Sequence, residues 1–338
     1  MTYANPHAPE DAFLETFPGA MALDLGMRRG LIDRIALDGA VPVDALNLPA
    51  EAAFFPVLLE RAGVVVRTGD ALSLTDAFAR VWPARRTALA HKLRFLKAVS
   101  VDLAMGMSDL VGDLPTFMKQ AHSFDIFDYS HALKTDADAL ARTQIWCDYV
   151  AVLTETEAPE ITAAIDLDPG ARVLEVGGNV GVLASAIMTA FGAEVMVLDL
   201  PGVCELGKRR NAERASGARP TFVAGDARQG EWDELPGAPW DAVLFKSVLH
   251  DWPEVQRGTL LDHALAALGP GGQVIIAERG PLEATGPLPY WLSADLVFAP
   301  FYRSGDWYAA ALRARGCEVR QFTPDLGLPF HITVGVKT

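Results

Sequence analysis

The chain has 338 residues, enough for two domains, and half of them are hydrophobic, which excludes disorder over most of its length. Its formal net charge of -14 disfavours nucleic acid and anionic membranes as partners, because the one short basic cluster, at 208–210, is typical of the exposed face of a helix. No run of residues approaches the roughly 18–20 apolar residues that span a bilayer.

The first residues and the cysteines point to a cytoplasmic protein. The N-terminal segment carries acidic residues early and lacks the basic and apolar regions of a signal peptide. Cys147, Cys204 and Cys317 lie far apart and show no paired metal-ligand spacing. We therefore expect free thiols in a reducing compartment, no metal site and a cytoplasmic location.

The first half of the chain, residues 12 to about 160, is predicted to be mostly helical. Apolar residues recur there at helical spacing, as in Leu89, Leu93 and Leu96. A short helix is expected at 43–46, a second at 56–62 closed by Gly63, and a hairpin at 64–74 around Gly69. This order is that of a winged helix, in an N-terminal domain that we place at 1–160.

A winged helix raises the possibility of DNA binding. Readers of the major groove need several Arg, Lys, Asn or Gln side chains on the recognition helix, but the helix at 56–62 offers only Arg61, beside Glu60. A role in dimerisation, or in covering a substrate, fits this composition better. A regulator that senses a cofactor and binds DNA stays as the alternative. A gel-shift assay tests it, and we expect no DNA binding.

From about residue 171 the pattern changes to alternating strands and helices. Strands are expected at 172–176, 194–199, 221–224, 241–245 and 273–278, and helices at 180–191, 203–216, 256–268 and 309–315. Apolar strands that alternate with helices predict an α/β fold, with a parallel sheet covered on both faces. The segments 318–322 and 331–336 look like a closing hairpin. We place this Rossmann-like domain at 161–338.

Glycines and acids follow the first three of these strands. The first strand ends in the segment EVGGNVG at 175–181, the second in Asp199 and the third in Gly225-Asp226. Glycines at a strand-to-helix turn let a ligand approach the backbone closely, and a carboxylate after the second strand can accept both hydroxyls of a ribose. The dinucleotide fingerprint G-x-G-x-x-G does not fit, because Asn179 stands at its second glycine. We expect the adenosyl group of S-adenosylmethionine there.

The fourth strand is followed by the most informative segment, FKSVLHDWP at 245–253. With K-x-x-L-H-D-W here, E-x-G-G-x-x-G at the first strand, D-L-P at 199–201 and G-D at the third strand, the chain resembles the plant-type caffeate and flavonoid O-methyltransferases and their bacterial small-molecule relatives. The resemblance covers nearly the whole chain, since that family also carries an N-terminal winged-helix dimerisation domain. It implies methyl transfer from S-adenosylmethionine to a hydroxyl of a small aromatic or apolar natural-product or pigment intermediate.

The resemblance also implies roles for individual residues. His250 would be the general base that removes the hydroxyl proton, and Glu278, near the end of the fifth strand, would orient it. The implied cofactor-binding residues are Glu175, Gly177, Gly178, Gly181, Asp199, Leu200, Gly225, Asp226, Lys246 and Trp252. A homodimer is also implied, and the apolar stretch at 13–32 suits that use.

Two departures from the family pattern leave alternatives open. Asn179 and Val180 replace the usual small G-T pair of the first loop, and the segment APFYRSG at 299–305 lacks the second glutamate of the plant G-G-x-E-R-T pattern. The base is therefore expected to have one orienting carboxylate. Methylation of carbon or nitrogen, or non-methylating chemistry on the same scaffold, becomes the alternative to O-methylation.

The acceptor is expected to bind among aromatic side chains, because the chain is rich in rings and has no basic cluster for a phosphate. The candidate lining residues are Phe117, Met118, Phe124, Phe127, Tyr129, Trp146, Tyr149, Trp291, Phe298, Phe301 and Tyr302.

Overall fold

The computed structural model describes residues 7–213, 217–230, 232–283 and 288–338. The chain forms two compact units. Unit 1 comprises Met1–Phe124 with Thr285–Val297, and unit 2 comprises Asp125–Ala284 with Phe298–Thr338. The domain boundary at residue 160 stays a prediction; the segment just before it belongs, in this structure, to unit 2.

Unit 1 contains the predicted helix-and-hairpin arrangement. Its first helices are α1 (Phe17–Arg28), α2 (Leu31–Asp38) and α3 (Phe54–Arg61), with short 3-10 helices at Pro9–Phe13, Asp44–Leu46, Ala50–Ala52 and Tyr290–Asp295. The strands β1 (Val41–Pro42), β2 (Val65–Thr68) and β3 (Ala71–Leu74) form a small sheet in the order β1-β3-β2. The hairpin turn contains Gly69 at a positive φ of 60°, a conformation that suits glycine. The helix at 56–62 and the hairpin at 64–74 are thus confirmed.

A long helix, α4 (Asp76–Gly112), follows the hairpin. The Thr75 side chain caps it by accepting the backbone N–H of Phe78 at 3.2 Å. The short helices α5 (Leu114–Gln120) and α6 (His122–Ile126) come next. Among the described residues, no helix combines the length and the apolar character needed to cross a membrane.

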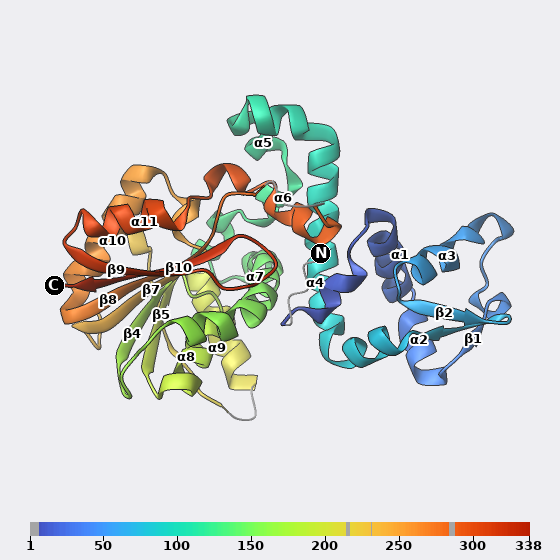
Figure 1. The fold of residues 1–338 in the computed structure, drawn as a ribbon, viewed down its shortest axis with the longest axis horizontal. Helices are drawn as coiled ribbons and strands as arrows, with labels where there is room; N and C mark the ends of the chain where they lie inside the picture. Colours follow the sequence, from blue (N-terminus) through green and yellow to red (C-terminus); the bar gives the residue numbers. More distant parts are fainter. Residues whose placement is uncertain (1–6, 214–216, 231, 284–287) are drawn as a thin grey trace. The chain divides into compact units, whose positions relative to one another are not determined.

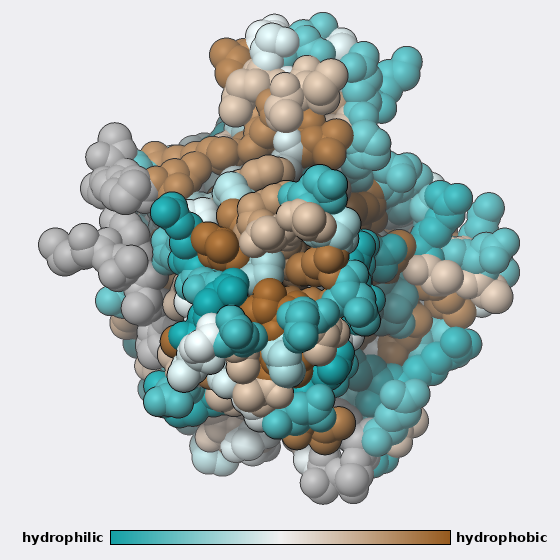
Figure 2. Space-filling view, turned by 90° about the vertical axis from the view of Figure 1, so that its right-hand side faces the viewer, coloured by the Kyte–Doolittle hydropathy of each residue, from teal (hydrophilic) through white to brown (hydrophobic). Residues whose placement is uncertain are grey.

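Part of unit 1 exposes apolar side chains. Met105 and Val111 on the second half of α4 are 83% and 82% exposed, and Val101 and Met118 are exposed as well. In the space-filling view, hydrophobic side chains show at the surface of the segment at the top, which the end of α4 and α5 form (Figure 2). Within the predicted stretch at 13–32, by contrast, Leu14, Leu23 and Ile32 are fully buried in unit 1.

Unit 2 is built on a seven-stranded sheet in the order β6-β5-β4-β7-β8-β10-β9 (Figure 1). The strands are β4 (Arg172–Val176), β5 (Glu194–Asp199), β6 (Thr221–Ala224), β7 (Trp240–Lys246), β8 (Leu268–Arg279), β9 (Cys317–Phe322) and β10 (Phe330–Lys337). The strands β4 to β8 run parallel to one another, and β10 pairs antiparallel with both β8 and β9. The parallel sheet and the closing hairpin are therefore confirmed.

The helices of unit 2 cover both faces of this sheet (Figure 1). They are α7 (Ala137–Ala164), α8 (Val182–Phe191), α9 (Pro201–Glu213), α10 (Glu254–Ala267) and α11 (Gly305–Arg313), with 3-10 turns at Tyr129–Leu133, Ala227–Gln229, Leu249–Asp251 and Ala299–Phe301. The last residues of the helix predicted at 203–216, namely 214–216, lie outside the described residues.

Alternation along the strands decides which helices each side chain meets. Val173, Leu244 and Ile275 pack in the core layer formed with α7 and α8, whereas the next residues along, such as Leu174, pack in the layer formed with α10 and α11. Continuing this period of two, Glu278 and Arg279 at the end of β8 face opposite sides of the sheet. This difference shapes the site at the carboxyl edge of the sheet.

Candidate active site

The loop between β4 and α8 is packed so closely that glycine is required in it. Gly177 and Gly181 have φ values of 66° and 77°. A Cβ atom on Gly177 would lie 2.6 Å from a Val248 methyl carbon, and one on Gly178 would lie 2.7 Å from the Glu175 carboxyl group. The side chains of Val248 and Glu175 thus fill the space that a Cβ atom would need at these two positions.

Asp199, at the end of β5, is connected directly to this loop. Its Oδ2 accepts the backbone N–H of Asn179 at 2.8 Å, and its Oδ1 accepts the N–H of Leu200 at 2.7 Å. The Asp199 backbone oxygen accepts the N–H of Gly225 at 2.9 Å, which brings in the loop after β6. Burial raises the pKa of Asp199 to about 6, although the two backbone N–H groups oppose this shift. At neutral pH the side chain is a carboxylate with lone pairs left for a ligand.

Among the residues that the structure describes, the buried polar atoms without a hydrogen-bond partner include three in β4 and in the loops after β4 and β7. They are Oε2 of Glu175, Oδ1 of Asn179 and Oγ of Ser247. Burial raises the pKa of Glu175 to about 8, against the opposing effect of Lys246, so this side chain is mostly protonated at neutral pH. Buried polar groups are normally paired, and such unpaired atoms gathered at one edge mark a place where a polar ligand fits.

The backbone conformation of Asn179 explains why this loop accepts an asparagine where the family pattern has a small residue. Its φ of 54° lies in the left-handed region, where asparagine is among the better tolerated residues after glycine. Its Nδ2 donates to the Cys147 backbone oxygen at 3.3 Å, which anchors the loop to α7.

Asp226 and Trp252 both contact Arg228. The Asp226 side chain accepts the backbone N–H of Arg228 at 3.0 Å and pairs with its guanidinium at 2.6 Å, and this pairing lowers the pKa of Asp226. The same guanidinium stacks 4.4 Å from the centre of the Trp252 ring. Asp226 is therefore a helix-capping residue in this structure, and the predicted adenine contact stays a prediction.

Lys246 belongs to a buried ion cluster that the sequence did not reveal. Its Nζ lies 2.5 Å from Oε2 of Glu157 on α7, and it donates to the Thr154 hydroxyl at 3.1 Å. Glu157 also accepts from Arg279 at 2.7 Å. The cluster ties α7 to the ends of β7 and β8, beneath the loop residues just described.

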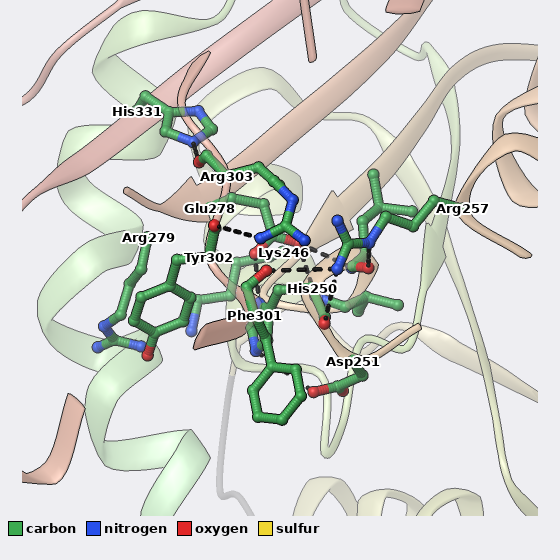
Figure 3. A network of polar contacts seen from close by, with 12 residues as sticks. Lys246, His250, Asp251, Arg257, Glu278, Arg279, Phe301, Tyr302, Arg303 and His331 are labelled. Carbon is green, nitrogen blue, oxygen red and sulfur yellow. Dashed lines mark hydrogen bonds and ion pairs between the residues drawn. The ribbon is translucent and has the colours of Figure 1, made fainter. Parts of the chain in front are cut away.

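His250 and Glu278 form the pair that the sequence predicts. Nδ1 of His250 lies 2.5 Å from Oε2 of Glu278, and His250 is only 8% exposed (Figure 3). The other carboxylate oxygen of Glu278 accepts the backbone N–H groups of Val248 and Leu249 at 2.9 and 2.8 Å. A carboxylate in this arrangement fixes both the orientation and the tautomer of the imidazole, because its partner Nδ1 has to carry the hydrogen.

His250 and Glu278 each shift the pKa of the other toward its charged form. Burial raises the pKa of Glu278, but His250 and the two backbone N–H groups outweigh it, so the pKa is lowered overall. Burial lowers the pKa of His250, but the carboxylates of Glu278 and Asp251 outweigh it and raise this pKa above its usual value.

The structure corrects the expectation that His250 has a single carboxylate neighbour. Oδ1 of Asp251 lies 3.3 Å from Nε2, on the opposite side of the ring from Glu278. The segment at 299–305 does lack an acid, and Tyr302 from that segment places its ring edge-on to His250, 5.3 Å between centres. The second carboxylate at the ring is that of Asp251, the residue after the base.

Arg257 on α10 holds the backbone of the His250 segment. Its Nε donates to the Leu249 oxygen at 2.8 Å, and its Nη2 donates to the oxygens of His250 and Phe301 at 3.2 and 3.3 Å (Figure 3). Sequence reasoning missed this residue. The available signal was a cation on the apolar face of the helix, four residues before Leu261 and seven before Ala264, where only a paired arginine is stable.

The predicted aromatic residues fall into separate groups. In unit 2, Phe127 contacts Trp146, Tyr149 and Phe298, with ring centres 6.1, 6.4 and 5.4 Å apart. In unit 1, Phe117 and Phe124 contact each other at 6.2 Å. Trp291 is also in unit 1, where its backbone N–H donates to the Leu14 oxygen at 3.0 Å. The structure therefore groups Trp146, Tyr149, Phe298 and Tyr129 around Phe127, and a role in acceptor binding stays a prediction for all the candidates.

Comparison with known proteins agrees with this site. Residues 103–287, more than half of the chain, match the model of the O-methyltransferase domain. The chain is 33% identical over 174 residues to 3-hydroxy-5-methyl-1-naphthoate 3-O-methyltransferase of Streptomyces sahachiroi, a match that covers 48% of each protein. It is also 33% identical over 131 residues to aclacinomycin 10-hydroxylase RdmB of Streptomyces purpurascens, covering 38% of this chain and 33% of that protein. The chain thus spans about half, or less, of the length of these curated relatives.

A solved structure matches over nearly the whole chain. It is that of NcsB1, an O-methyltransferase from neocarzinostatin biosynthesis, in complex with S-adenosylmethionine and 2-hydroxy-5-methyl naphthoic acid. The match covers 96% of this chain and 98% of that chain, with a TM-score of 0.67 and 21% sequence identity, and shows a shared fold. From the match over residues 103–287, the chain belongs to the family defined by the O-methyltransferase domain.

Proposed function

We propose that this protein is an S-adenosylmethionine-dependent O-methyltransferase that acts on a hydroxyl of a small aromatic or apolar natural-product or pigment intermediate. The observation that carries the proposal is the buried His250–Glu278 pair, with its 2.5 Å contact, in a chain of the O-methyltransferase domain family. The naphthoate methyltransferase relative, whose name specifies a 3-O-methyl transfer, supports an aromatic acceptor.

The residues around the first loop fit the proposed cofactor. Asp199, which accepts the backbone N–H of Asn179 in the glycine loop, offers carboxylate lone pairs to ribose hydroxyls. The unpaired oxygens of Glu175, Asn179 and Ser247 offer further polar contacts. In our proposal Gly181, Leu200, Gly225, Asp226, Lys246 and Trp252 complete this site. When bound, S-adenosylmethionine supplies an activated methyl group with a good leaving group.

The task left to the protein is to align the acceptor and to remove its proton. In neutral His250, with Nδ1–H directed at Glu278, Nε2 is free of hydrogen and can accept the hydroxyl proton. Glu278 then stabilises the imidazolium that forms, as an acid does behind the histidine of a hydrolase triad. Such base catalysis is worth about 10²–10⁴-fold in rate.

We propose that the acceptor ring lies among the aromatic residues of unit 2. Trp146, Tyr149 and Phe298 surround Phe127, and Tyr302 stands beside His250. Flat apolar side chains near a base suit a phenol or an enol, whose ring can stack while its hydroxyl points to Nε2.

A second function is favoured by one comparison. The relative RdmB is named a 10-hydroxylase, so a protein with this domain can carry out chemistry other than O-methylation. Replacing His250 by alanine separates the two: an O-methyltransferase loses most of its rate, whereas chemistry that needs no hydroxyl proton removed keeps it.

Dimer formation is a further part of the proposal. The exposed apolar side chains of Val101, Met105 and Val111 on α4, with Met118 on α5, give unit 1 a surface that a second copy can cover.

We also propose that the protein acts in the cytoplasm. Its three cysteines, Cys147, Cys204 and Cys317, are free and buried, as is usual for proteins of a reducing compartment.

The test of the proposed function combines binding and product analysis. Calorimetric titration with S-adenosylhomocysteine should show binding by the wild type and much weaker binding by Asp199→Asn. Incubation with methyl-deuterated cofactor and a panel of hydroxynaphthoates and other phenols should give a product with a labelled O-methyl group. Binding without any labelled product from phenolic or enolic acceptors would instead favour the second function.

A further inference from the structure

A chain of contacts reaches His250 from the side opposite Glu278. The Tyr129 hydroxyl donates to Oδ2 of Asp251 at 2.9 Å. The other oxygen of Asp251, Oδ1, lies 3.3 Å from Nε2 of His250. Glu278 contacts the far nitrogen of the same ring, Nδ1, at 2.5 Å. The imidazole is thus held between two carboxylates, and a tyrosine holds one of these.

The Tyr129 ring is fixed by packing that does not depend on its hydroxyl. It stands edge-on to Trp146, with ring centres 5.3 Å apart, and edge-on to Phe127 at 6.5 Å. It begins the 3-10 helix Tyr129–Leu133, which Asp128 caps by accepting the backbone N–H of Ser130 at 2.9 Å. A phenylalanine at this position would keep these contacts and lose only the hydrogen bond to Asp251.

The proton positions follow from the geometry. Both backbone N–H groups that reach Glu278 end on Oε1, so Oε2 is the acceptor for the Nδ1–H of His250. In a neutral ring Nε2 then carries a lone pair, which an ionised Asp251 oxygen at 3.3 Å repels. The same contact becomes attractive once Nε2 carries a proton. An ionised Asp251 therefore stabilises the protonated base, and the Tyr129 O–H favours the ionised form of Asp251.

We infer that Tyr129 is a positioning residue for the base: its hydroxyl keeps Asp251 ionised beside Nε2 of His250, where Asp251 stabilises the imidazolium. In the proton transfer, the acceptor O–H bond breaks, its electron pair stays on the oxygen, and the proton forms the Nε2–H bond. This inference rests on the proposed function for the identity of the proton donor.

The charged groups around the pair set the direction of the expected effect. Burial lowers the pKa of His250, Glu278 and Asp251 raise it, and Arg279 lowers it slightly. The pKa of Asp251 is raised overall: burial and Glu278 raise it, whereas His250, the Tyr129 hydrogen bond and Arg257 lower it. Removing the Tyr129 hydroxyl therefore makes Asp251 easier to protonate, and a protonated Asp251 no longer raises the pKa of His250. The pKa of His250 should fall.

The experiment measures the titration of His250 and the pH profile of kcat in Tyr129→Phe and Asp251→Asn. The His250 signal is identified in the NMR spectrum of histidine-labelled protein by its loss in His250→Gln. We expect its midpoint to move to lower pH in Tyr129→Phe and further in Asp251→Asn, and the acid limb of kcat to move in the same direction. Tyr290→Phe is the matched control, since its hydroxyl bonds to Ser100 within unit 1 at 2.8 Å; it should move neither.

An unmoved His250 titration in Tyr129→Phe, even with a lower kcat, would overturn the inference and leave Tyr129 a packing residue. The NMR titration needs no turnover, so it decides the point even if no acceptor is methylated and the proposed function fails. Should Asp251→Asn not fold, Tyr129→Phe alone carries the test, because it leaves ring and carboxylate in place.

Discussion

At the scale of single residues, the proposed removal of the acceptor's proton depends on His250. Its Nδ1 is committed to Glu278, and its Nε2 is the one ring nitrogen that can take a proton from an acceptor. Neighbouring carboxylates raise the pKa of His250 above its usual value, so the protonated form, which cannot act as a base, persists to higher pH than in a free histidine.

We predict that His250→Gln lowers kcat by about 10²–10⁴-fold while binding of S-adenosylhomocysteine is retained. In the wild type, kcat should rise with pH through the raised pKa of His250, since only the unprotonated ring accepts a proton. Steady-state kinetics across the pH range, with calorimetry on the variant, checks both. A variant that keeps the wild-type kcat and pH profile would remove His250 from the mechanism.

At the scale of elements, α10 and α7 position the site through buried charges. Arg257 ties α10 to the turn that carries His250, and Glu157 ties α7 to the ends of β7 and β8. Both side chains are buried, with 3% and 1% of their surface exposed. Changes at either position should therefore act on the site and on stability together.

Arg257→Lys is predicted to lower kcat by about 10- to 100-fold, because an ammonium cannot serve the carbonyls of Leu249, His250 and Phe301 in the fork geometry of arginine. The unpaired carbonyls should also cost about 1–3 kcal/mol of stability. Kinetics and urea unfolding measure the two effects. Arg209→Lys, at an exposed pair with Glu205, is the control and should change neither measurably; equal effects at both positions would contradict the assigned role.

Glu157→Gln should cost about 3–5 kcal/mol in unfolding free energy, because it removes a buried negative charge that pairs with both Lys246 and Arg279. Glu155→Gln on the same helix changes an exposed carboxylate that pairs with Arg210 and should cost under about 1 kcal/mol. Urea unfolding followed by circular dichroism compares them. Similar losses in both variants would show that the cluster is not a stabilising feature.

At the scale of the whole molecule, sequence patterns predicted the fold well. Alternation of apolar strands with helices, the glycine turn after β4 and the hairpin in unit 1 are local signals, and each corresponds to an observed element. His250 and Glu278 were predicted as a pair from the resemblance to the O-methyltransferases, and an acid at the end of an apolar strand is costly to bury unless it is paired.

The parts that sequence could not predict depend on contacts between distant residues. Glu157 meets Arg279 across 122 residues, and Tyr129 meets Asp251 across the same separation, so no local pattern shows either contact. The dimerisation role suggested for 13–32 stays a prediction, since Leu14, Leu23 and Ile32 in that stretch fill the core of unit 1 while Phe17 is half exposed. A second exposed apolar surface, at Met105 and Val111 on α4, was not expected from the sequence.

That surface leads to a prediction about assembly. The wild type should be a dimer at micromolar concentration, and Met105→Glu combined with Val111→Glu should yield monomers, because charges on the covered apolar face would be desolvated. Size-exclusion chromatography with light scattering measures both. Leu37→Glu, at an exposed apolar position on α2, is the control and should stay dimeric. A monomeric wild type would contradict the assignment.

The most direct test of the whole account is a crystal structure of the protein grown with S-adenosylhomocysteine. We predict electron density for the adenosyl group against the backbone of Gly177, with its ribose hydroxyls bonded to the Asp199 carboxylate and its sulfur on the side of His250. Density for the ligand away from Gly177 and Asp199, or a His250 ring that cannot reach an acceptor placed at the sulfur, would contradict it.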